Sequence, residues 1–310
     1  MANPTISTIY SGEALDELLT KMVTGNEIVQ KGLVHVQNNI QKKFALPRVK
    51  SGKRLQARKP TLTAADAKGG FDIDERYLEP NDAMVFDMFN PREFESFWRP
   101  FQPQGALVYR ELPAQVQQAL IDVMTDQLDT ELNDAIINGD TVSAVEELAQ
   151  FNGLIKRLTE DGDTIVIPTP EVITVGNVAS KLDLCYKAAP EAVRRKSNCK
   201  FIVSTNTMDL YEESEYAKQF KGANSTDNVP ARYRGKTMVD VVDFPDDCIL
   251  FCIADNTRSS NLWLGVDFAD DDETIQIDKL SPADEQYFFK MLMKMDTNVV
   301  FPEEAVLYKV

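Results

Sequence analysis

The chain has 310 residues, of which 43% are hydrophobic and 9% aromatic; this is the composition of a folded globular protein and excludes wholesale disorder. Its net charge of −16 argues against general affinity for nucleic acid, because a coat of carboxylates repels phosphate. It has no apolar run of the roughly 18–20 residues that a membrane span needs. Its four cysteines are too few for a disulfide framework and indicate a reducing intracellular compartment.

The N-terminal residues, 1–42, are predicted to form an arm. Apolar residues recur at helical spacing from Glu13 to Thr24, and Gly25 follows them, so the pattern predicts a short helix there. Residues 32–40 are expected to be extended. They include the one histidine of the chain, His35, which is predicted to be a partly buried structural residue because no nucleophile motif accompanies it.

A basic segment follows the arm. It carries eight positive charges and no acid between residues 42 and 65, so the rest of the chain sums to −24. A segment this basic needs a counter-charge on the same chain, on another copy of it, or on nucleic acid. The eight side chains are Lys42, Lys43, Arg48, Lys50, Lys53, Arg54, Arg58 and Lys59.

The chain then turns back on itself at Gly69 and Gly70. The returning limb, FDIDERYLEPNDAMVFDMF, is acidic and apolar. Two limbs of similar length and opposite charge around a glycine turn predict a long two-stranded hairpin or loop. It is too polar to form a core of its own, so we expect it to project from the body of the protein.

Helical periodicity is strongest from Leu112 to Asn138, with Pro113 in the first turn and Gly139 just past the end. A helix over these residues would be about 40 Å long and is typical of one that lies across a sheet. A second helix is predicted from Val178 to Ala189, between Asn177 as a cap and Pro190. Strands are predicted at 200–205, 238–244, 248–254, 274–280, 287–301 and 305–310. Helices that precede strands without regular alternation predict an α+β fold.

No pattern in the sequence predicts an active site. Gly235-Lys236-Thr237 ends like a phosphate-binding loop, but Pro230 stands where that loop needs its first glycine, so a turn entering a strand is predicted. Cys248 and Cys252 would lie on one face of a strand and lack the further ligands of a zinc site, so they are predicted to be buried thiols. The sequence predicts no catalytic, metal-binding or cofactor-binding residues, and the protein is not expected to be an enzyme.

An acidic stretch complements the basic segment. Between Asp240 and Asp278 there are eleven acids and one base, Arg258. We predict that this stretch contacts the basic segment of another copy, with nucleic acid as the second choice. The acidic residues assigned to this contact are Asp246, Asp247, Asp267, Asp270, Asp271, Asp272 and Glu273.

The order of these parts resembles a known family. An arm precedes a long charged hairpin, an aromatic stretch (FESFWRPFQPQGALVYRELP), a very long helix ending in INGD, and the short motif FNGLIKRL. A region with the pattern helix, strand, helix and a β-rich end closing on DTNVVFPEEAVLYKV complete the order. In this order the chain resembles the major capsid protein of tailed bacteriophages, whose Hong Kong 97-type fold is shared with encapsulins and herpesvirus capsid floors.

The resemblance implies a division of the chain and a set of partners. It places an N-terminal arm at 1–42, an extended loop at 43–90, a peripheral domain at 91–171 with a spine helix at 112–138, an axial domain at 172–260, and return strands of the peripheral domain at 261–310. It implies a structural protein that assembles with itself, as hexamers and pentamers, into an icosahedral head around double-stranded DNA, without sequence-specific contact to that DNA.

The resemblance also implies a separate scaffolding protein and a portal as partners, no membrane, and a place in the virion after assembly in the host cytoplasm. Three alternatives stay open at this point. They are an encapsulin-like shell that is not viral, a nucleic-acid-binding module that uses residues 42–65, and an α+β enzyme with a nonstandard carboxylate site.

Overall fold

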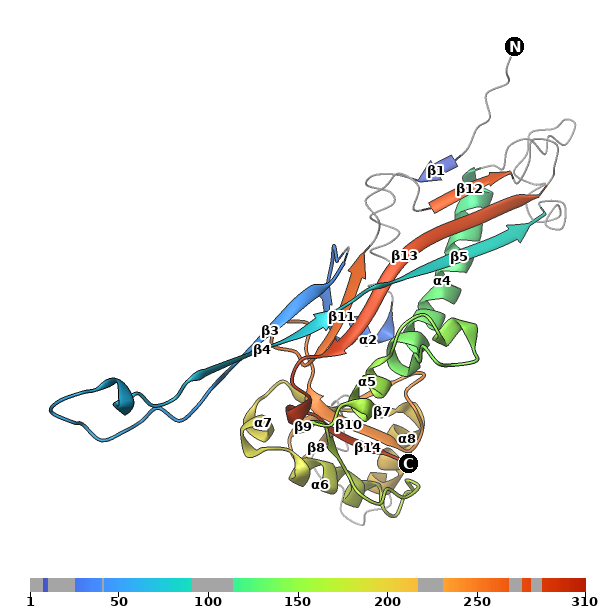
Figure 1. The fold of residues 1–310 in the computed structure, drawn as a ribbon. Helices are drawn as coiled ribbons and strands as arrows, with labels where there is room; N and C mark the ends of the chain where they lie inside the picture. Colours follow the sequence, from blue (N-terminus) through green and yellow to red (C-terminus); the bar gives the residue numbers. More distant parts are fainter. Residues whose placement is uncertain are drawn as a thin grey trace, which may run out of the picture.

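The computed structural model describes residues 8–10, 26–40, 42–90, 114–216, 231–267, 275–279 and 286–310. Two sheets and the helices packed on them form the body, and a two-stranded hairpin projects from it (Figure 1). The predicted helix at 13–24 and the aromatic stretch at 94–113 lie outside the described residues. The mixture of helices and strands confirms the predicted α+β class.

The first sheet has six strands in the described part of the chain, in the order β1-β12-β13-β11-β2, with β5 also paired to β13. On one face of the long strand β13, alternate residues from Tyr287 to Met295 are buried, and the helix α4 (Ala114–Asn138) lies along this face (Figure 1). The bounds are β1 (Thr8–Tyr10), β2 (His35–Gln37), β5 (Asn81–Phe89), β11 (Leu262–Asp267), β12 (Ile275–Lys279) and β13 (Tyr287–Val299).

The long helix ends where the sequence predicts. The N–H of Gly139 donates to the carbonyl oxygen of Ala135 at 2.9 Å, and the N–H of Gly153 donates to the carbonyl oxygen of Gly139 at 2.8 Å. A Cβ atom on Gly139 would lie 2.5 Å from the oxygen of Phe151, and one on Gly153 would lie 2.5 Å from the nitrogen of Gly139. The two glycine motifs, INGD and FNG, therefore form one close backbone contact between α4 and α5 (Leu154–Glu160).

The second sheet has the strand order β6-β14-β10-β7-β9-β8. Its central strand β10 has the sequence CILFCI and is buried at every position, because both faces of the sheet are covered. α6 (Val178–Ala188) and α8 (Thr205–Tyr216) pack on one face, and α7 (Glu191–Arg195) lies against β7. The bounds of the strands are β6 (Ile165–Val166), β7 (Cys199–Ser204), β8 (Arg232–Tyr233), β9 (Lys236–Val241), β10 (Cys248–Ile253) and β14 (Val306–Lys309).

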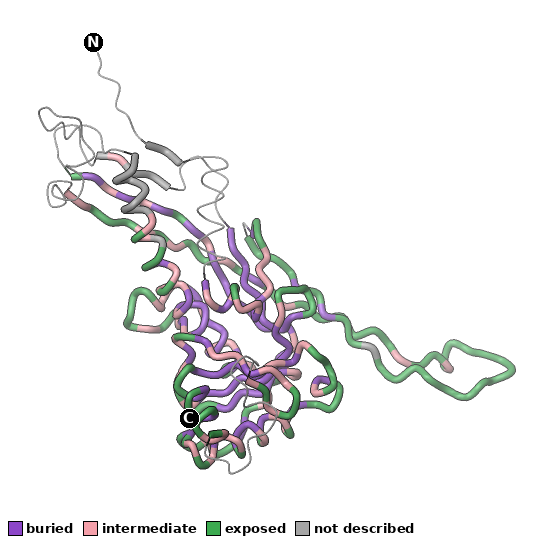
Figure 2. The backbone as a smooth tube through the Cα atoms, turned by 180° about the vertical axis from the view of Figure 1, so that it is seen from behind, coloured by how far each residue is buried: buried purple, intermediate pink, exposed green. Residues whose placement is uncertain are grey.

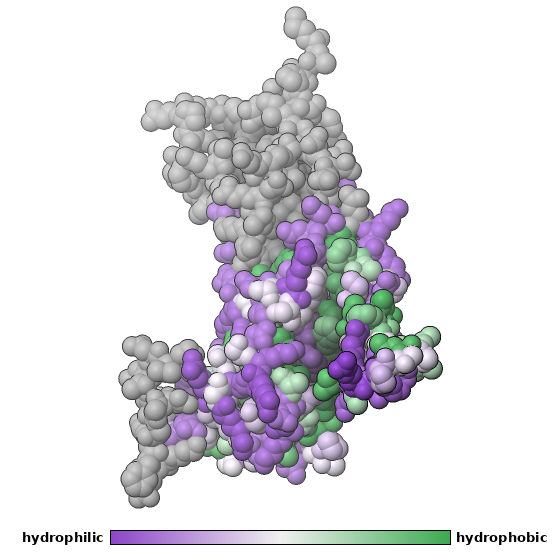
Figure 3. Space-filling view, turned by 90° about the vertical axis from the view of Figure 1, so that its left-hand side faces the viewer, coloured by the Kyte–Doolittle hydropathy of each residue, from purple (hydrophilic) through white to green (hydrophobic). Residues whose placement is uncertain are grey.

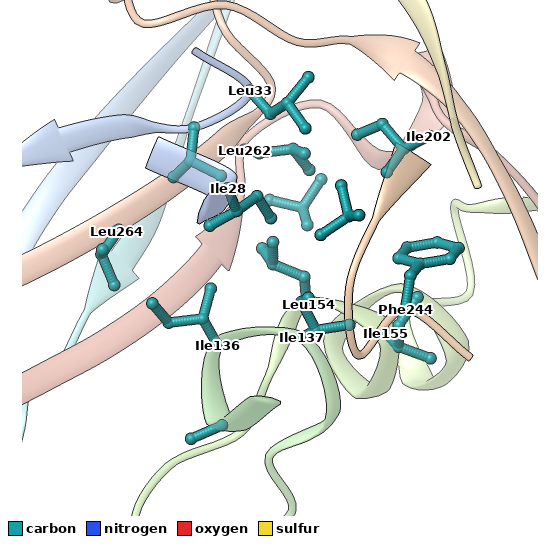
Figure 4. Packing of buried hydrophobic residues seen from close by; sticks show 14 of the residues in the cluster. Ile28, Leu33, Ile136, Ile137, Leu154, Ile155, Ile202, Phe244, Leu262 and Leu264 are labelled. Atoms are coloured by element: carbon teal, nitrogen blue, oxygen red, sulfur yellow. The ribbon is translucent and has the colours of Figure 1, made fainter. Parts of the chain in front are cut away.

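The two sheets share a core. Ile137 of α4, Leu154 of α5, Ile202 of β7 and Leu262 of β11 belong to one buried cluster, and Figure 4 shows them converging. The short helix α2 (Glu27–Gln30) adds Ile28 to the same cluster. Figure 2 shows buried backbone where the sheets meet and exposed backbone along the hairpin. The hairpin therefore stands outside the core, as predicted.

Four details differ from the sequence analysis. β5 pairs with β13 in the body, so the projecting hairpin ends at Leu78 and does not extend to residue 90. The C-terminal strand β14 pairs with β10 in the second sheet, whereas the sequence analysis grouped it with the return strands that form the first sheet. The Asn177 side chain accepts a hydrogen bond from the Thr174 N–H upstream of α6 and does not cap that helix. Strand β11 was not among the predicted strands.

Candidate assembly surfaces

The hairpin consists of β3 (Phe44–Ser51) and β4 (Phe71–Leu78), paired over eight residues. The chain between them contains one 3-10 turn, η1 (Ala64–Asp66). The N–H of Gly52 donates to the carbonyl oxygen of Gly70 at 3.3 Å and closes the end of the ladder. Gly69 has a φ of 76°, a conformation that glycine adopts without strain. The chain reverses within the loop 52–70 and not in a turn at Gly69 and Gly70 as predicted, because Gly70 already lies opposite Gly52 at the base of that loop.

One face of the hairpin is charged, and its basic residues at the root find counter-charges within the chain. Arg48 is 4% exposed; it donates to the carbonyl oxygen of Val300 at 3.1 Å and pairs with Asp74 across the ladder. The Glu303 carboxylate lies 3.5 Å from Arg48 and 2.6 Å from Lys50. These basic side chains therefore anchor the hairpin to its own subunit, although the sequence analysis assigned them to contacts with another copy.

A second set of charges fixes the point where β4 passes into β5. The carboxylate of Asp296, 1% exposed, accepts hydrogen bonds from Arg157 and from the Glu79 N–H, each at 2.8 Å. Burial raises the pKa of Asp296, against the lowering effect of Arg157. Arg76 of β4 pairs with Asp161 after α5. Because Asp296 lies on β13, these contacts tie the hairpin to the first sheet.

The opposite face of the hairpin is apolar and exposed. Val49 and Ile73 are cross-strand partners, and their side chains are 58% and 66% exposed. Phe71 and Tyr77 lie on the same face and are exposed as well. Figure 3 views the molecule from the side on which the hairpin projects, and hydrophobic and strongly hydrophilic residues lie side by side on the projecting segment. A monomeric protein rarely exposes apolar residues in such a row, so this face is a candidate contact surface.

The tip of the hairpin is basic. Lys53 and Arg58 have no acidic partner among the described residues, whereas Lys59 pairs with Asp66. The Arg54 guanidinium lies 3.9 Å from the centre of the Phe71 ring. Between these cations, Leu55 is 99% exposed.

The outer face of the first sheet, turned away from α4, is a second apolar surface. Met84, Phe86 and Met88 of β5 are exposed there, and Leu292 of β13 lies beside them. Phe86 stacks on Phe288 with 6.0 Å between ring centres. Alternation along the strand produces this face, because the alternate β5 residues such as Val85 point to α4.

A groove runs between β5 and α4. It consists of two cavities of about 550 and 280 Å³ that share Val85, Leu128 and Glu131. Apolar side chains such as Met124 form its floor, and carboxylates stand along its rim. No lysine or arginine is among the described residues that line it. The rim carboxylates are Asp87, Asp126, Glu131, Glu146 and Glu147.

The acidic residues that the sequence analysis selected have different environments. Asp246 is exposed between β9 and β10, and Asp247 beside it accepts a hydrogen bond from the Ile173 N–H at 2.6 Å. Asp267 is 3% exposed at the end of β11, and this burial argues against a surface contact there. Residues 270–273, which hold the other four acids, lie outside the described residues.

The residues considered for chemistry have structural environments, as predicted. His35 packs edge-on against Trp263, and its Nδ1 donates to the Asn256 carbonyl oxygen at 2.9 Å. All four cysteines are free and buried, and burial raises the pKa of the Cys185, Cys199 and Cys248 thiols to about 12. Gly235 forms the turn between β8 and β9 with a φ of 77°.

The described part of the chain contains no group of three or more histidine, cysteine, aspartate or glutamate residues arranged to hold a metal ion. None of its helices combines the length and the apolar character needed to cross a membrane.

No family model matches the chain, and no curated protein matches its sequence significantly. Its structure is similar to the capsid of the empty GTA particle, with a TM-score of 0.61 and 14% identity over 89% of this chain and 93% of that one. The satellite phage P4 procapsid, solved with its size determination (Sid) protein, gives a TM-score of 0.60 and 12% identity, covering 94% and 98%. The chain has the Hong Kong 97-type capsid fold.

A third structure with a similar fold is the virus-like particle from Pyrococcus furiosus, with a TM-score of 0.51, 10% identity, and coverage of 94% and 96%. Each of these likenesses spans nearly the whole of both chains. The fold expected from the order of sequence motifs is therefore confirmed.

Within this capsid fold, the structure brings together residues that the sequence did not connect. Glu303 lies far from the basic segment in sequence but pairs with two of its members, and Asp296 binds Arg157 and the backbone at Glu79. The groove acids come from β5, α4 and the turn η4 (Glu146–Leu148). The one signal in the sequence was the density of acids along one predicted helix, which alone is typical of a solvated face.

Proposed function

We propose that this protein is a major capsid protein that assembles with itself, as hexamers and pentamers, into an icosahedral head enclosing double-stranded DNA. The capsid fold over nearly the whole chain supports a shell-forming role. We propose a structural and not a catalytic function, with a virion location after assembly in the host cytoplasm. A separate scaffolding protein and a portal are proposed as partners, and the DNA is proposed to be enclosed without sequence-specific contact.

The observation that carries the proposal is the exposed apolar face of the hairpin. A two-stranded ladder with both faces in water is marginally stable, so a hairpin that presents Val49, Phe71 and Ile73 to solvent needs a partner surface. The outer face of the first sheet offers exposed Met84 and Phe86 for such packing. Interfaces of stable shells bury on the order of 2,000 Å² or more, and a projecting hairpin adds contact area without enlarging the core.

Complementary charges on neighbouring copies would fix the register of their contact and steer their encounter. Exposed ion pairs are worth about 0–1 kcal/mol each and are screened by salt, so many weak contacts allow an assembling shell to correct its errors. Asp246 and Asp247, with the acids at 270–273, stay proposed contacts for the basic segment of a neighbouring copy. The body of the protein is acidic and would repel phosphate, so DNA enclosed by the shell would not adhere to its wall.

The test is the assembly state of the full chain, measured by light scattering and electron microscopy, alone and when co-expressed with the other head proteins. Closed shells are expected. The variant Val49→Ser with Ile73→Ser should stay folded by circular dichroism but fail to assemble. Val172→Ser, at an exposed position outside the hairpin, is the matched control and should assemble normally. Protein that stays monomeric under all these conditions would refute the proposal.

The likeness to the virus-like particle from Pyrococcus furiosus favours one other candidate, an encapsulin-like shell that is not viral. The content of purified particles separates the two. A head should protect double-stranded DNA of defined length from nuclease, whereas an encapsulin-like shell should contain protein cargo and no protected DNA.

A further inference from the structure

We infer that a basic face beside the second sheet, formed by α7 and the turn between β8 and β9, contacts the phosphate backbone of the enclosed double-stranded DNA. The inference rests on the proposed enclosure of DNA and names the place where the wall meets it. It differs from the alternative in which residues 42–65 bind nucleic acid, because it uses another part of the chain. The basic face consists of Arg194, Arg195, Lys196, Arg232, Arg234 and Lys236.

The basic face reverses the charge of the chain locally. Its residues come from the segments 192–200 and 229–239, which together hold seven lysines or arginines and no acid, although the net charge of the chain is −16. β7 and β9 are neighbours in the sheet, and the Nζ of Lys236 donates to the carbonyl oxygen of Lys196 at 2.6 Å. The two segments therefore lie side by side (Figure 1), a contact that the sequence did not single out.

Two arginines of this face lie near one aromatic ring. The Cζ atoms of Arg194 and Arg234 are 5.5 and 5.4 Å from the centre of the Tyr186 ring of α6. Arg194 has no acidic partner among the described residues, and its buried Nε makes no hydrogen bond to them. Arg234 shares the carboxylate of Asp183 with Lys187, at 2.6 and 2.5 Å. Cations held this close repel one another, and a bound anion relieves that repulsion.

The turn that carries Arg234 is strained. Tyr233 pairs with Lys236, and the two residues between them, Arg234 and Gly235, have φ values of 48° and 77°. Positive φ at both positions is typical of a type I′ turn, which favours asparagine or glycine at the first of them. Arginine in this conformation is unfavourable to the fold, so the cation at the end of the turn indicates a role outside the folding of the subunit.

Double-stranded DNA is the partner that best matches this face. It carries one negative charge per about 1.7 Å of helix axis, which is the densest counter-charge available to a protein that encloses DNA. The planar guanidinium group of arginine binds phosphate oxygens through two hydrogen bonds. Contact with only a few phosphates is weak at physiological salt, so it would order the DNA beside the wall without fixing it there. The acidic remainder of the wall confines the contact to this face.

Binding of the full chain to a short fluorescent DNA duplex, measured at several salt concentrations, tests the inference. The basic-face variant combines Arg194→Gln, Arg234→Asn and Lys236→Gln. It should lower the affinity at low salt about tenfold or more and reduce the slope of log K against log salt concentration by about three. Its melting temperature should not fall, because asparagine suits the turn.

A hairpin variant is the matched control for the DNA measurement. It removes the same charge from the other basic region with Lys53→Gln, Arg54→Gln and Arg58→Gln. Its affinity for the duplex and its salt slope should equal those of the wild-type chain. Loss of binding in the hairpin variant with none in the basic-face variant, or a wild-type chain that does not bind DNA at low salt, would overturn the inference.

Assembly separates this inference from the proposed function and from a contact between copies. The basic-face variant should form the same shells as the wild-type chain by sedimentation and electron microscopy. If it folds but does not assemble, the face contacts a second copy, whose exposed acids Asp209, Glu212 and Glu213 on α8 would supply the counter-charge, and the inference is refuted. A wild-type chain that binds DNA through this face but never forms shells would support the phosphate contact and contradict the proposed function.

Discussion

The β3–β4 hairpin and the β7–β10 pair are both antiparallel ladders, but they are held in different ways. β10 is buried along its whole length, and Phe201 of β7 stacks on Phe251 of β10 with 4.3 Å between ring centres. β4 is exposed along most of its length, and the ion pair of Arg76 with Asp161 connects its root to the body. The second sheet therefore derives its stability from burial within the subunit. The hairpin is held only at its root, by the buried Leu46 and Leu78 and by ion pairs, and its exposed apolar face is the proposed contact with a second copy.

The largest expected effect is the loss of unfolding free energy when a buried ring of the second sheet is removed. Phe251→Ala should lower the free energy of unfolding by about 3–5 kcal/mol, because it removes a fully buried ring and leaves a cavity. Ile73→Ala on the exposed face of the hairpin should change it by less than about 0.5 kcal/mol in the isolated subunit. Urea unfolding followed by circular dichroism measures both. Equal losses in the two variants would show that the hairpin belongs to the same cooperative core.

The glycine contact between α4 and α5 should give the next largest effect. Gly139→Ala should cost about 1–3 kcal/mol of unfolding free energy, because the added methyl group meets the backbone oxygen of Phe151. Gly162→Ala is the matched control, since a Cβ atom there has no neighbour within 4 Å and the position has no positive φ. Thermal unfolding of both variants checks this. A Gly139 variant as stable as the Gly162 variant would mean that the junction can relax.

The sequence predicted those parts of the molecule that local pattern controls. Apolar periodicity gave the long helix, and Gly139 marked its end. Opposite charge on the two limbs on either side of Gly69 predicted the hairpin. The predicted end of its returning limb was wrong, because the chain leaves the hairpin after Leu78 and continues as β5, which pairs with β13. Strand partners depend on residues far apart in sequence, so the pairing of β14 with β10 and of Glu303 with Lys50 had no local signal. The groove had only one weak signal, the density of acids along the predicted helix, because the packing of β5 on α4 creates it.

A smaller effect is expected at the root of the hairpin. Glu303→Gln removes the carboxylate shared by Arg48 and Lys50 and should cost about 1 kcal/mol or less, because the pair with Lys50 is partly exposed to solvent. Hydrogen exchange should become faster in β3 and β4 and stay unchanged in β10. Glu304→Gln, whose carboxylate pairs with Lys196 away from the hairpin, is the control. Unchanged exchange in the hairpin of the Glu303 variant would show that the remaining contacts suffice.

The smallest expected effect is on how stability depends on pH. Two carboxylates at the hairpin root, Asp296 and Asp161, should change the free energy of unfolding with pH in opposite directions. Burial raises the pKa of Asp296 from its ordinary value of 3.8, and Arg157 offsets only part of that rise. Between 3.8 and the raised value the folded chain binds more protons than the unfolded chain, so Asp296 lowers stability as the pH rises through this window. At Asp161, burial also raises the pKa, but the hydrogen bonds from Arg76 and the Asp163 N–H outweigh it and leave the pKa lowered.

Asp161 therefore contributes stability above its ordinary pKa of 3.8, and that stability is lost as the pH falls through the lowered value. Urea unfolding across the acidic range checks both signs. The stability of the wild-type chain relative to Asp296→Asn should fall as the pH rises above 3.8, whereas its stability relative to Asp161→Asn should rise with pH up to about that point and then level off. A rise in both comparisons would mean that Arg157 more than compensates the burial of Asp296. The ionised Asp296 carboxylate would then add to the stability of the hairpin root, beside the burial of Leu46 and Leu78.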